Sequence, residues 1–168
     1  NTLTAGTQWQ WQHNGTGGYG FLLPNYDRYS TGIYVRHDFA LNKKWHFNAG
    51  MRYDFAKVET EAFFDPILHN YMLARGMNEE TSAFYAQRAM DVKRRFDNIN
   101  WLVGLRYHST TLWSLAMNIG KSFRVPTASE LSANGVHHGS FRHEAGNQYL
   151  NPEQSLFADA QLTITTNK

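Results

Sequence analysis

Residues 45–55 read WHFNAGMRYDF, and this stretch decides the fold. Its odd-numbered side chains are apolar or aromatic, whereas its even-numbered positions are polar, charged or glycine. The first set is Trp45, Phe47, Ala49, Met51, Tyr53 and Phe55, and the second is His46, Asn48, Gly50, Arg52 and Asp54. Successive side chains of a strand point to opposite faces, so this alternation predicts a strand with one apolar face and one polar face.

The same alternation predicts five further strands, each long for a soluble domain. With residues 45–58, the predicted strands are residues 2–13, 30–41, 96–108, 112–123 and 153–166. Their apolar faces carry mainly Leu, Ile, Val, Ala and Trp, and their other faces carry mainly Gln, Asn, Ser, Thr, Arg, Asp and Gly. His37 breaks this pattern, because it falls on an apolar face between Val35 and Phe39.

Two short connections alternate with three long ones. Residues 42–44 and 109–111 are predicted hairpin turns, whereas residues 14–29, 59–95 and 124–152 are predicted long loops at the opposite end of the sheet. Outer-membrane barrels have short periplasmic turns, long extracellular loops and spanning strands of about 9–11 residues. The sequence therefore predicts an all-β fold, an antiparallel up-and-down meander of about six long strands from a transmembrane β-barrel.

The amino-acid composition only partly narrows the possible classes of protein. The 42% hydrophobic content and mean hydropathy of −0.55 suit a soluble β domain equally well. The chain has no Cys, which excludes disulfides and thiolate metal sites. Its net charge of +2 comes from dispersed basic residues. The tight cluster at residues 93–95 is expected to be a solvated loop end, so no nucleic-acid partner is predicted.

Tryptophan placement favours a membrane setting. All five Trp residues fall within predicted strands, and Trp45 and Trp113 follow the two short turns. Indole rings favour the headgroup level of a bilayer, so an aromatic girdle is expected there. The alternative is a soluble sandwich with the tryptophans in its core, because periodicity alone does not distinguish an outer apolar face from an inner one.

Residues 121–155 read KSFRVPTASELSANGVHHGSFRHEAGNQYLNPEQS and resemble the late-barrel region of TonB-dependent outer-membrane receptors. In that family one strand ends in Ser-Phe-Arg-x-Pro-x-x-x-Glu-Leu, and the next begins after Gly-Asn-x-x-Leu-x-Pro-Glu. The matching residues are Ser122, Phe123, Arg124, Pro126, Glu130 and Leu131, followed by Gly146, Asn147, Leu150, Pro152 and Glu153. We expect these residues to shape the barrel rim, with Arg124 paired to Glu130, and not to contact ligand.

The resemblance implies a 22-stranded barrel in the outer membrane of a Gram-negative bacterium, in contact with outer-membrane lipid. This chain is expected to be an arc of that barrel, with Asn1 at a cut end. The family's N-terminal plug and the segment that contacts the TonB complex are not in it. A lipid-embedded sheet of six strands alone is excluded, because each unpaired backbone group in hydrocarbon costs several kcal/mol.

The implied function is energised uptake of a scarce nutrient, above all an iron–siderophore, haem or another metal complex. The alternative is a passive or structural barrel, such as a porin or adhesin, whose loops bind surface partners. The sequence shows no Ser-His-Asp grouping or paired carboxylates that would indicate an enzyme, and no resident cofactor is expected.

Candidate ligand contacts lie in the long loops. His137, His138 and His143, with Glu144, are candidates for a transition metal or haem, because imidazole is a common ligand of both. Tyr19, Tyr26 and Tyr29 are candidates for stacking on a flat ligand. Their spacing leaves open the alternatives of solvated histidines and of tyrosines that only pack the loop.

The second loop is long for a structureless loop, so we expect some local structure or disorder in it. Residues 71–90 are a candidate for a short helix over the barrel mouth. Met72, Met77 and Met90, with His69, are candidates for a soft metal or haem. The alternative is that these methionines fill gaps in a hydrophobic core.

Overall fold

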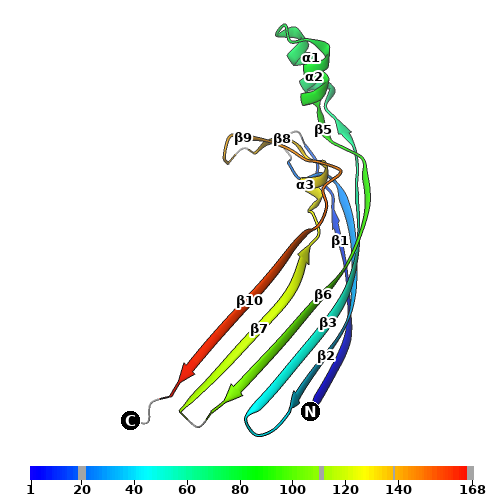
Figure 1. Ribbon diagram of the computed structural model, residues 1–168. Coiled ribbons are helices and arrows are strands. Elements are labelled where there is room, and N and C mark those ends of the chain that lie inside the picture. Colours follow the sequence, from blue (N-terminus) through cyan, green and yellow to red (C-terminus); the bar gives the residue numbers. More distant parts are fainter. Residues whose placement is uncertain (19–21, 110–111, 138, 166–168) are drawn as a thin grey trace.

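The computed structural model describes residues 1–18, 22–109, 112–137 and 139–165. Six long strands form one antiparallel sheet in which each pairs with the next. They are β1 (Thr2–Asn14), β2 (Tyr26–Ala40), β3 (Trp45–Thr60), β6 (Val92–His108), β7 (Trp113–Arg124) and β10 (Glu153–Ile164). The sheet is bowed, and every long connection lies at the end opposite the two termini (Figure 1). The predicted antiparallel meander is confirmed.

Strands β2, β3 and β6 extend at the loop end by two or more residues beyond their predicted limits, and β1 and β7 extend by one. Strand β2 begins at Tyr26, four residues before the prediction, and pairs there with Thr60 at the end of β3. Strand β6 begins at Val92, which also pairs with Thr60. The predicted loops 14–29 and 59–95 were therefore too long. The prediction that residues 93–95 form a loop end is wrong, because they lie inside β6 and pair with β3.

The apolar face of the sheet is exposed. Trp9 is 81% exposed, and the other large exposed side chains of this face include Leu3, Ile33, Val35, Met51, Tyr53, Ile99, Met117, Ile119, Leu156, Leu162 and Ile164. In the part of the chain that the structure describes, no second sheet covers them. Within the described residues, the tryptophans are therefore not packed in a core between two sheets. An apolar patch of this extent is stable against lipid and unstable against water.

The limits of this apolar band slant across the sheet. At the loop end, the last large apolar residue of the band is Trp11 on β1 and Leu156 on β10. When the cross-strand pairing is followed from β1 to β10, Leu156 lies six residues closer to the turn end than the position on β10 that is level with Trp11. At the turn end, the limit moves by the same six residues from Leu3 on β1 to Ile164 on β10.

Six residues are about 20 Å along a strand, and five strand spacings are about 24 Å. The strands therefore tilt by about 40° from the normal of the plane that limits the band. Transmembrane barrels have strand tilts of about 35–45°.

His37 is less anomalous in this geometry. It is exposed on the outward face near the turn end of the band, and its ring stacks on Phe39 with centroids 4.9 Å apart. Phe39 in turn lies 5.0 Å from the ring of Phe47. His37 thus extends an aromatic cluster at the turn end of the band, where polar ring atoms are tolerated if that end lies at a membrane surface.

Above the band, the polarity of the two faces inverts. The outward positions of β3 become Lys57 and Glu59, whereas the inward residues Ala56 and Val58 are buried. These inward residues form a core with Val92, Phe96, Val125, Ala128 and Leu131. We call this group the rim core. It holds α3 (Ala128–Ser132) against the inner face of the sheet.

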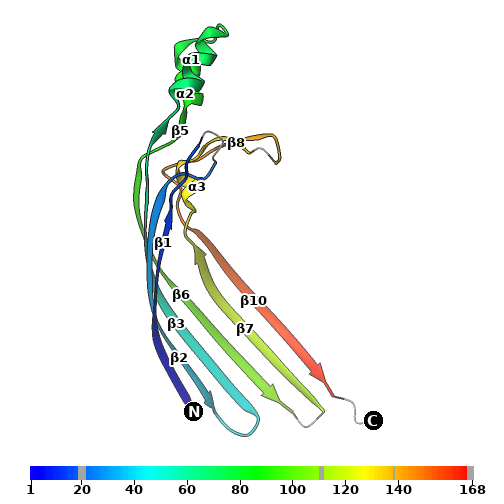
Figure 2. The same cartoon turned by 180° about the vertical axis from the view of Figure 1, so that it is seen from behind.

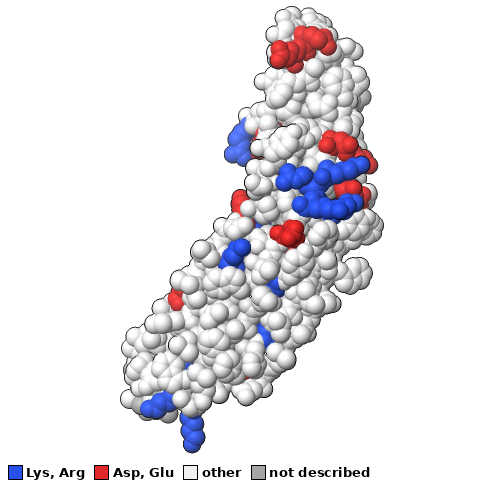
Figure 3. Space-filling view, turned by 45° about the vertical axis from the view of Figure 1, so that its right-hand side comes forward, with Lys and Arg blue, Asp and Glu red and all other residues white. Residues whose placement is uncertain are grey.

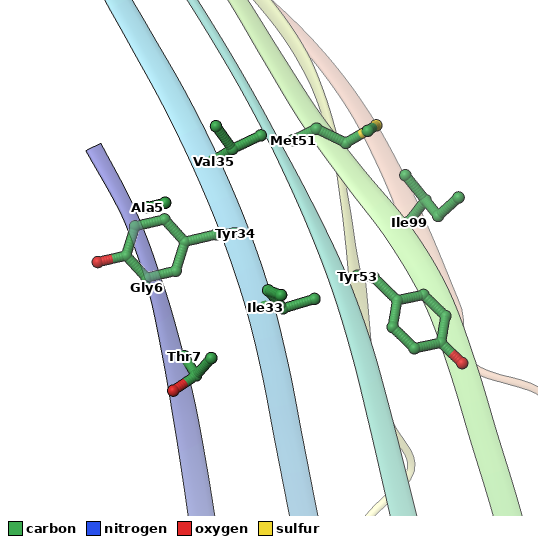
Figure 4. Close-up of a pocket in the computed structure, with 9 residues that line it drawn as sticks. All are labelled: Ala5, Gly6, Thr7, Ile33, Tyr34, Val35, Met51, Tyr53 and Ile99. Carbon is green, nitrogen blue, oxygen red and sulfur yellow. The ribbon is translucent and has the colours of Figure 1, made fainter. Parts of the chain in front are cut away.

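Glycines on the inner face make room for neighbouring side chains. A Cβ at Gly6 would lie 2.7 Å from the hydroxyl oxygen of Tyr34, its cross-strand partner, and one at Gly120 would lie 2.7 Å from the ring of Phe157. Figure 4 shows Tyr34 reaching across β1 at Gly6. Tyr34 lines one side of a 550 Å³ hollow whose other walls include Val35, Met51 and Ile99. Most of the residues that line this hollow belong to the apolar band.

The two longer excursions carry smaller elements. Strand β3 leads to β4 (Phe63–Phe64), α1 (Pro66–Ala74), α2 (Glu79–Ala86) and β5 (Gln87–Ala89), and β7 leads to α3, β8 (Asn134–His137) and β9 (Arg142–Ala145). The helices α1 and α2 stand beyond the end of β3 and β6, whereas β8 and β9 lean towards the concave side (Figures 1 and 2).

The helix expected within residues 71–90 is therefore two helices, which stand beyond the end of the sheet (Figure 1). The first begins earlier than expected because Asp65 caps it, accepting from the amides of Ile67 and Leu68, with Pro66 in the first turn. No helix among the described residues is long and apolar enough to cross a bilayer.

Candidate ligand-binding site

The second and third long loops are joined by hydrogen bonds at the rim. The Ser132 hydroxyl donates to the carbonyl of Met90 at 2.6 Å, and the Met90 amide donates to the Ser132 carbonyl at 3.1 Å. Ala89 and Ala133 form a β-bridge beside them. Ser132 is fully buried. The two loops therefore form one unit above the barrel wall.

Asn134 fixes the end of α2 against β8. Its side-chain NH2 group donates to the backbone carbonyls of Phe84 at 2.6 Å and Gln87 at 2.9 Å, and the Asn134 backbone carbonyl accepts from Arg88 Nε at 3.1 Å. Asn134 is only 6% exposed. Its amide satisfies two carbonyls at the end of a helix, where the helix itself provides no donors. The position of α2 beside β9 follows from this contact.

This arrangement places His143 beside two aromatic rings of α2. The His143 ring lies edge-on to Tyr85 with centroids 5.3 Å apart, and 6.3 Å from the ring of Phe84. Phe84 is 53% exposed and Tyr85 is 39% exposed, so both rings remain accessible. We call Phe84, Tyr85 and His143 the loop aromatic cluster. An imidazole beside accessible rings suits a planar ligand or the organic shell of a metal complex.

The predicted histidines do not all join this cluster. In the β8–β9 hairpin Val136 pairs with His143 and His137 pairs with Arg142, so His137 and His143 point to opposite faces. His138 lies outside the described residues. Glu144 pairs with Arg142 at 2.6 Å, which lowers the pKa of Glu144. Among the described residues no group of three His, Asp or Glu side chains has metal-site geometry.

The predicted tyrosines also separate. Tyr26 faces inward and packs against the rim core. Tyr29 faces outward and stacks on Trp11, with centroids 6.4 Å apart. That contact places Tyr29 in the aromatic edge of the apolar band, away from the lumen. Tyr19 lies outside the described residues.

The methionine and His69 group has packing roles. Met72 is buried within the α1–α2 pair, and Met90 packs against the rim core. His69 Nε2 lies 3.0 Å from a carboxylate oxygen of Glu79, which ties α1 to α2. Met77 is exposed. These contacts favour the gap-filling interpretation.

The first family motif forms a clamp at the rim. Arg124 donates to Glu130 at 2.8 Å and to Glu153 at 2.8 Å, so it connects β7, α3 and β10. The predicted pairing of Arg124 with Glu130 is confirmed. Glu130 also accepts from the Thr127 amide in a capping box at the start of α3. Arg124 and Thr127 together lower the pKa of Glu130 from its usual 4.5 to about 2.

The remaining motif residues surround α3. Leu131 is fully buried in the rim core, which Phe123 and Leu150 also contact. Pro126 is buried, and Pro152 lies just before β10. The Gly146 amide donates to Ala133, and a Cβ at Gly146 would lie 2.7 Å from the Ser132 amide nitrogen. Asn147 donates through its amide to the Glu130 carbonyl at 2.8 Å. These contacts support the rim-shaping role expected for the motif.

Below the rim, the inner wall carries a polar network across three strands. Arg52 Nε lies 2.6 Å from Asp54 Oδ1, Asn100 donates to Asp54 Oδ2 at 2.8 Å, and Arg52 reaches Gln8 Oε1 at 3.2 Å. These side chains line a 310 Å³ pocket that also includes Arg28 and Arg124. The inner wall therefore presents hydrogen-bonding groups directly below the loop unit.

Comparison with known proteins gives the family. The family model described as TonB dependent receptor-like, beta-barrel matches residues 1–163. Among solved structures, the chain is similar to a double mutant of the Serratia marcescens hemophore receptor HasR in complex with its hemophore HasA and heme. The TM-score is 0.67 at 16% sequence identity, over 94% of this chain and 25% of HasR.

No curated protein sequence matches the chain. The likeness to HasR is a likeness of fold, and the chain spans about a quarter of that receptor's length. The family match covers nearly all of the sheet, with its outward apolar band and tilted strands. The chain belongs to the TonB-dependent receptor-like β-barrel family.

Proposed function

We propose that this chain forms part of the wall and extracellular loops of an outer-membrane receptor for energised uptake of a metal complex. The complete receptor is then a 22-stranded barrel whose plug and TonB-contacting segment lie outside this chain. Haem or an iron–siderophore is the ligand class that we favour. The loop aromatic cluster carries this proposal, because it combines accessible rings with an imidazole at the extracellular end.

Two further observations support the proposal. The HasR structure contains heme and a hemophore, so a barrel of this fold accommodates such a ligand. The polar inner wall below the loops carries charged and amide side chains, which suit the carboxylate and hydroxamate groups that commonly surround bound iron. In the proposed barrel, this inner wall lines the interior through which a transported ligand passes.

The test measures binding by the complete receptor with ferric haem and with a ferric siderophore in separate titrations. We expect His143→Ala to weaken the binding of one of them by about tenfold, as for a residue central to a binding site. His137→Ala is the matched control, because it removes the same side chain from the opposite face of the hairpin. Unchanged affinity for both ligands in a Phe84→Ala, Tyr85→Ala, His143→Ala triple variant contradicts the proposed site.

The dependence of uptake on an energy source distinguishes the proposed receptor from a passive barrel. Cells that carry the complete receptor are expected to take up the ligand only while the inner-membrane proton gradient is intact. Uptake that continues after the gradient is dissipated would support a porin. Binding to a surface partner without any uptake would support an adhesin.

A further inference from the structure

Histidine and arginine side chains gather on the inner face at the turn end of the sheet. His46 on β3 and Arg106 on β6 are direct cross-strand partners, so their side chains lie on the same face. His108 is the next residue of β6 on this face, and its ring lies edge-on to the ring of His46 with centroids 5.5 Å apart. We call His46, Arg106 and His108 the inner His–Arg group.

The inner His–Arg group lines a hollow of 440 Å³ at the turn end. Two further charged side chains of this hollow, Arg36 and Asp38 on β2, pair with each other at 2.8 Å. Asn1, the first residue of the chain, also lines it. Figure 3 shows Lys and Arg side chains at the turn end, which is the lower end of that view. Among the described residues, the side chains of the hollow thus include two guanidinium groups and two imidazoles but one carboxylate.

Arg106 has no ion pair or side-chain hydrogen bond within the part of the chain that the structure describes. Asp38 is engaged by Arg36. Asp159, an inner-face carboxylate on β10, lies two strands from Arg106 and accepts from Asn118 at 2.9 Å. Arg106 is also exposed, so its guanidinium is available to an anion that arrives from the concave side of the sheet.

The donors of the inner His–Arg group suit a carboxylate. A planar guanidinium binds both oxygens of a carboxylate through two parallel N–H groups. A neutral imidazole adds one N–H donor, whereas an imidazolium adds two donors and a positive charge. Imidazoles take up protons in the mildly acidic range. The group is therefore expected to hold an anion more tightly as the pH falls below neutral.

We propose that the inner His–Arg group binds a carboxylate at the turn end of the inner wall. This carboxylate belongs either to a small molecule in the barrel interior or to an Asp or Glu side chain of the receptor outside this chain. The inference rests on the proposed barrel, but not on the ligand that the loops bind, because every long connection lies at the opposite end of the sheet (Figure 1).

The first experiment titrates the complete receptor in detergent with tartrate, a probe whose carboxyl groups are ionised at both pH 7.5 and pH 6.0. If a small molecule carries the carboxylate, tartrate is expected to bind about tenfold more tightly at pH 6.0, because the two imidazoles gain charge. Arg106→Gln is expected to weaken binding by about tenfold, as for the loss of a hydrogen bond to a charged group. Calorimetry measures both changes.

Matched variants separate this site from its surroundings. His46→Gln with His108→Gln is expected to remove the pH dependence of tartrate binding. His37→Gln is the control, because it removes an imidazole from the outward face at the same end of the sheet, and it is expected to leave binding unchanged. Arg106→Lys keeps the positive charge but loses the bidentate fork, so it is expected to weaken binding by only about threefold.

A carbodiimide cross-link in the Arg106→Lys variant identifies the source of the carboxylate. The reagent joins a lysine amine to a carboxylate in contact with it, and mass spectrometry identifies what has been joined. An amide with added tartrate, in a yield about tenfold above that at the exposed Lys43, assigns the site to a small molecule. An amide with an Asp or Glu outside residues 1–168 assigns it to the receptor itself, and tartrate is then expected not to bind.

Three results overturn the proposal. Tartrate binding that is unchanged in Arg106→Gln excludes the guanidinium from the site. An amide to Asp38 alone shows that the sheet itself neutralises position 106. The absence of both tartrate binding and any amide at position 106 shows that the group binds no carboxylate. Binding of haem or a siderophore by the same variants tests the proposed function separately.

Discussion

The lower wall and the rim of this sheet are built from the same strands, but their apolar side chains lie on opposite faces. In the lower part of β3, the outward residues Met51 and Tyr53 are exposed and apolar, while Arg52 and Asp54 face a wet interior. Four residues further along, Val58 is buried on the inner face and Lys57 is outside. The backbone pairing does not change between the two regions.

The difference shows that the surroundings, and not the sheet, decide which face is apolar. In the proposed membrane barrel, lipid would surround the outside of the lower wall, and water or polar groups would fill its inside. At the rim, water reaches the outside, and a hydrophobic core becomes possible only inside. One strand thus carries two patterns of opposite phase, which join near residues 55–56 of β3.

The largest expected effect contrasts two inward positions of β3. Val58→Asp buries an unpaired carboxylate in the rim core, and we expect it to destabilise the rim by roughly 3–5 kcal/mol. Hydrogen exchange of residues 124–137 in the complete receptor measures this loss. Asn48→Asp, inward in the lower wall, is the control and is expected to be nearly neutral. Equal protection in the two variants contradicts the inversion of faces.

The next effect contrasts two outward positions of the same strand. Met51→Arg places a cation against lipid and is expected to cost roughly 2–4 kcal/mol in urea unfolding from vesicles. Glu59→Arg lies above the band, so its cost is expected to stay below about 1 kcal/mol. A similar cost for both substitutions would show that the outward face meets a single environment.

A smaller effect concerns the unit that the two loops form at the rim. Asn134→Ala leaves the carbonyls of Phe84 and Gln87 without their donor, which is expected to cost about 1–3 kcal/mol. Faster hydrogen exchange in residues 84–89 and weaker ligand binding through His143 are the measurements. Asn147→Ala is the control, because the Asn147 side chain accepts from the exposed backbone amide of Tyr149. If the control and the variant behave alike, Asn134 does not position the loop aromatic cluster.

The smallest effect is the pH dependence of the rim clamp. Arg124 and Thr127 lower the pKa of Glu130 to about 2, below its usual 4.5. The carboxylate therefore stabilises the rim fully above about pH 4.5, and this contribution is lost as the pH falls towards 2. Because Glu130 is 39% exposed, we expect the contribution to be only about 1 kcal/mol.

Pepsin cleavage within residues 124–152 measures the clamp. Cleavage of the complete receptor is expected to increase between pH 4.5 and pH 2 beyond the change in pepsin activity on an unfolded substrate. Glu130→Gln lacks the titrating group, so its susceptibility is expected to be high at both pH values. A variant with the pH profile of the unaltered receptor would remove Glu130 from the clamp.

The sequence predicted the lower wall well, because period-two alternation persists for as long as one side of the strand meets lipid. It began β6 too late, because the phase inverts where the strands leave the band and Arg95 no longer reads as an outward apolar position. It also began β2 four residues too late. Arg124 and Glu130 were predicted as a pair because they lie close in sequence. Their additional contact with Glu153 depends on the pairing of β7 with β10.

The candidate site was predicted only in part. His143 was recognised by its chemistry, whereas Phe84 and Tyr85 gave no signal because α2 is a short exposed helix 57 residues or more away along the chain. Their proximity depends on Asn134 and on the hydrogen bonds between Met90 and Ser132. Such a contact between loops leaves no periodic trace in a single sequence. The separation of His137 from His143 likewise depends on the hairpin register.

The slant of the apolar band reaches beyond the six strands that display it. Each step across the sheet lowers both limits by a little more than one residue on average. Any chain segment that hydrogen-bonds to the free side of β10 must continue this descent, and one beside β1 must begin it higher. The position along a candidate strand at which polar residues change to apolar ones would therefore show where that strand belongs in the barrel.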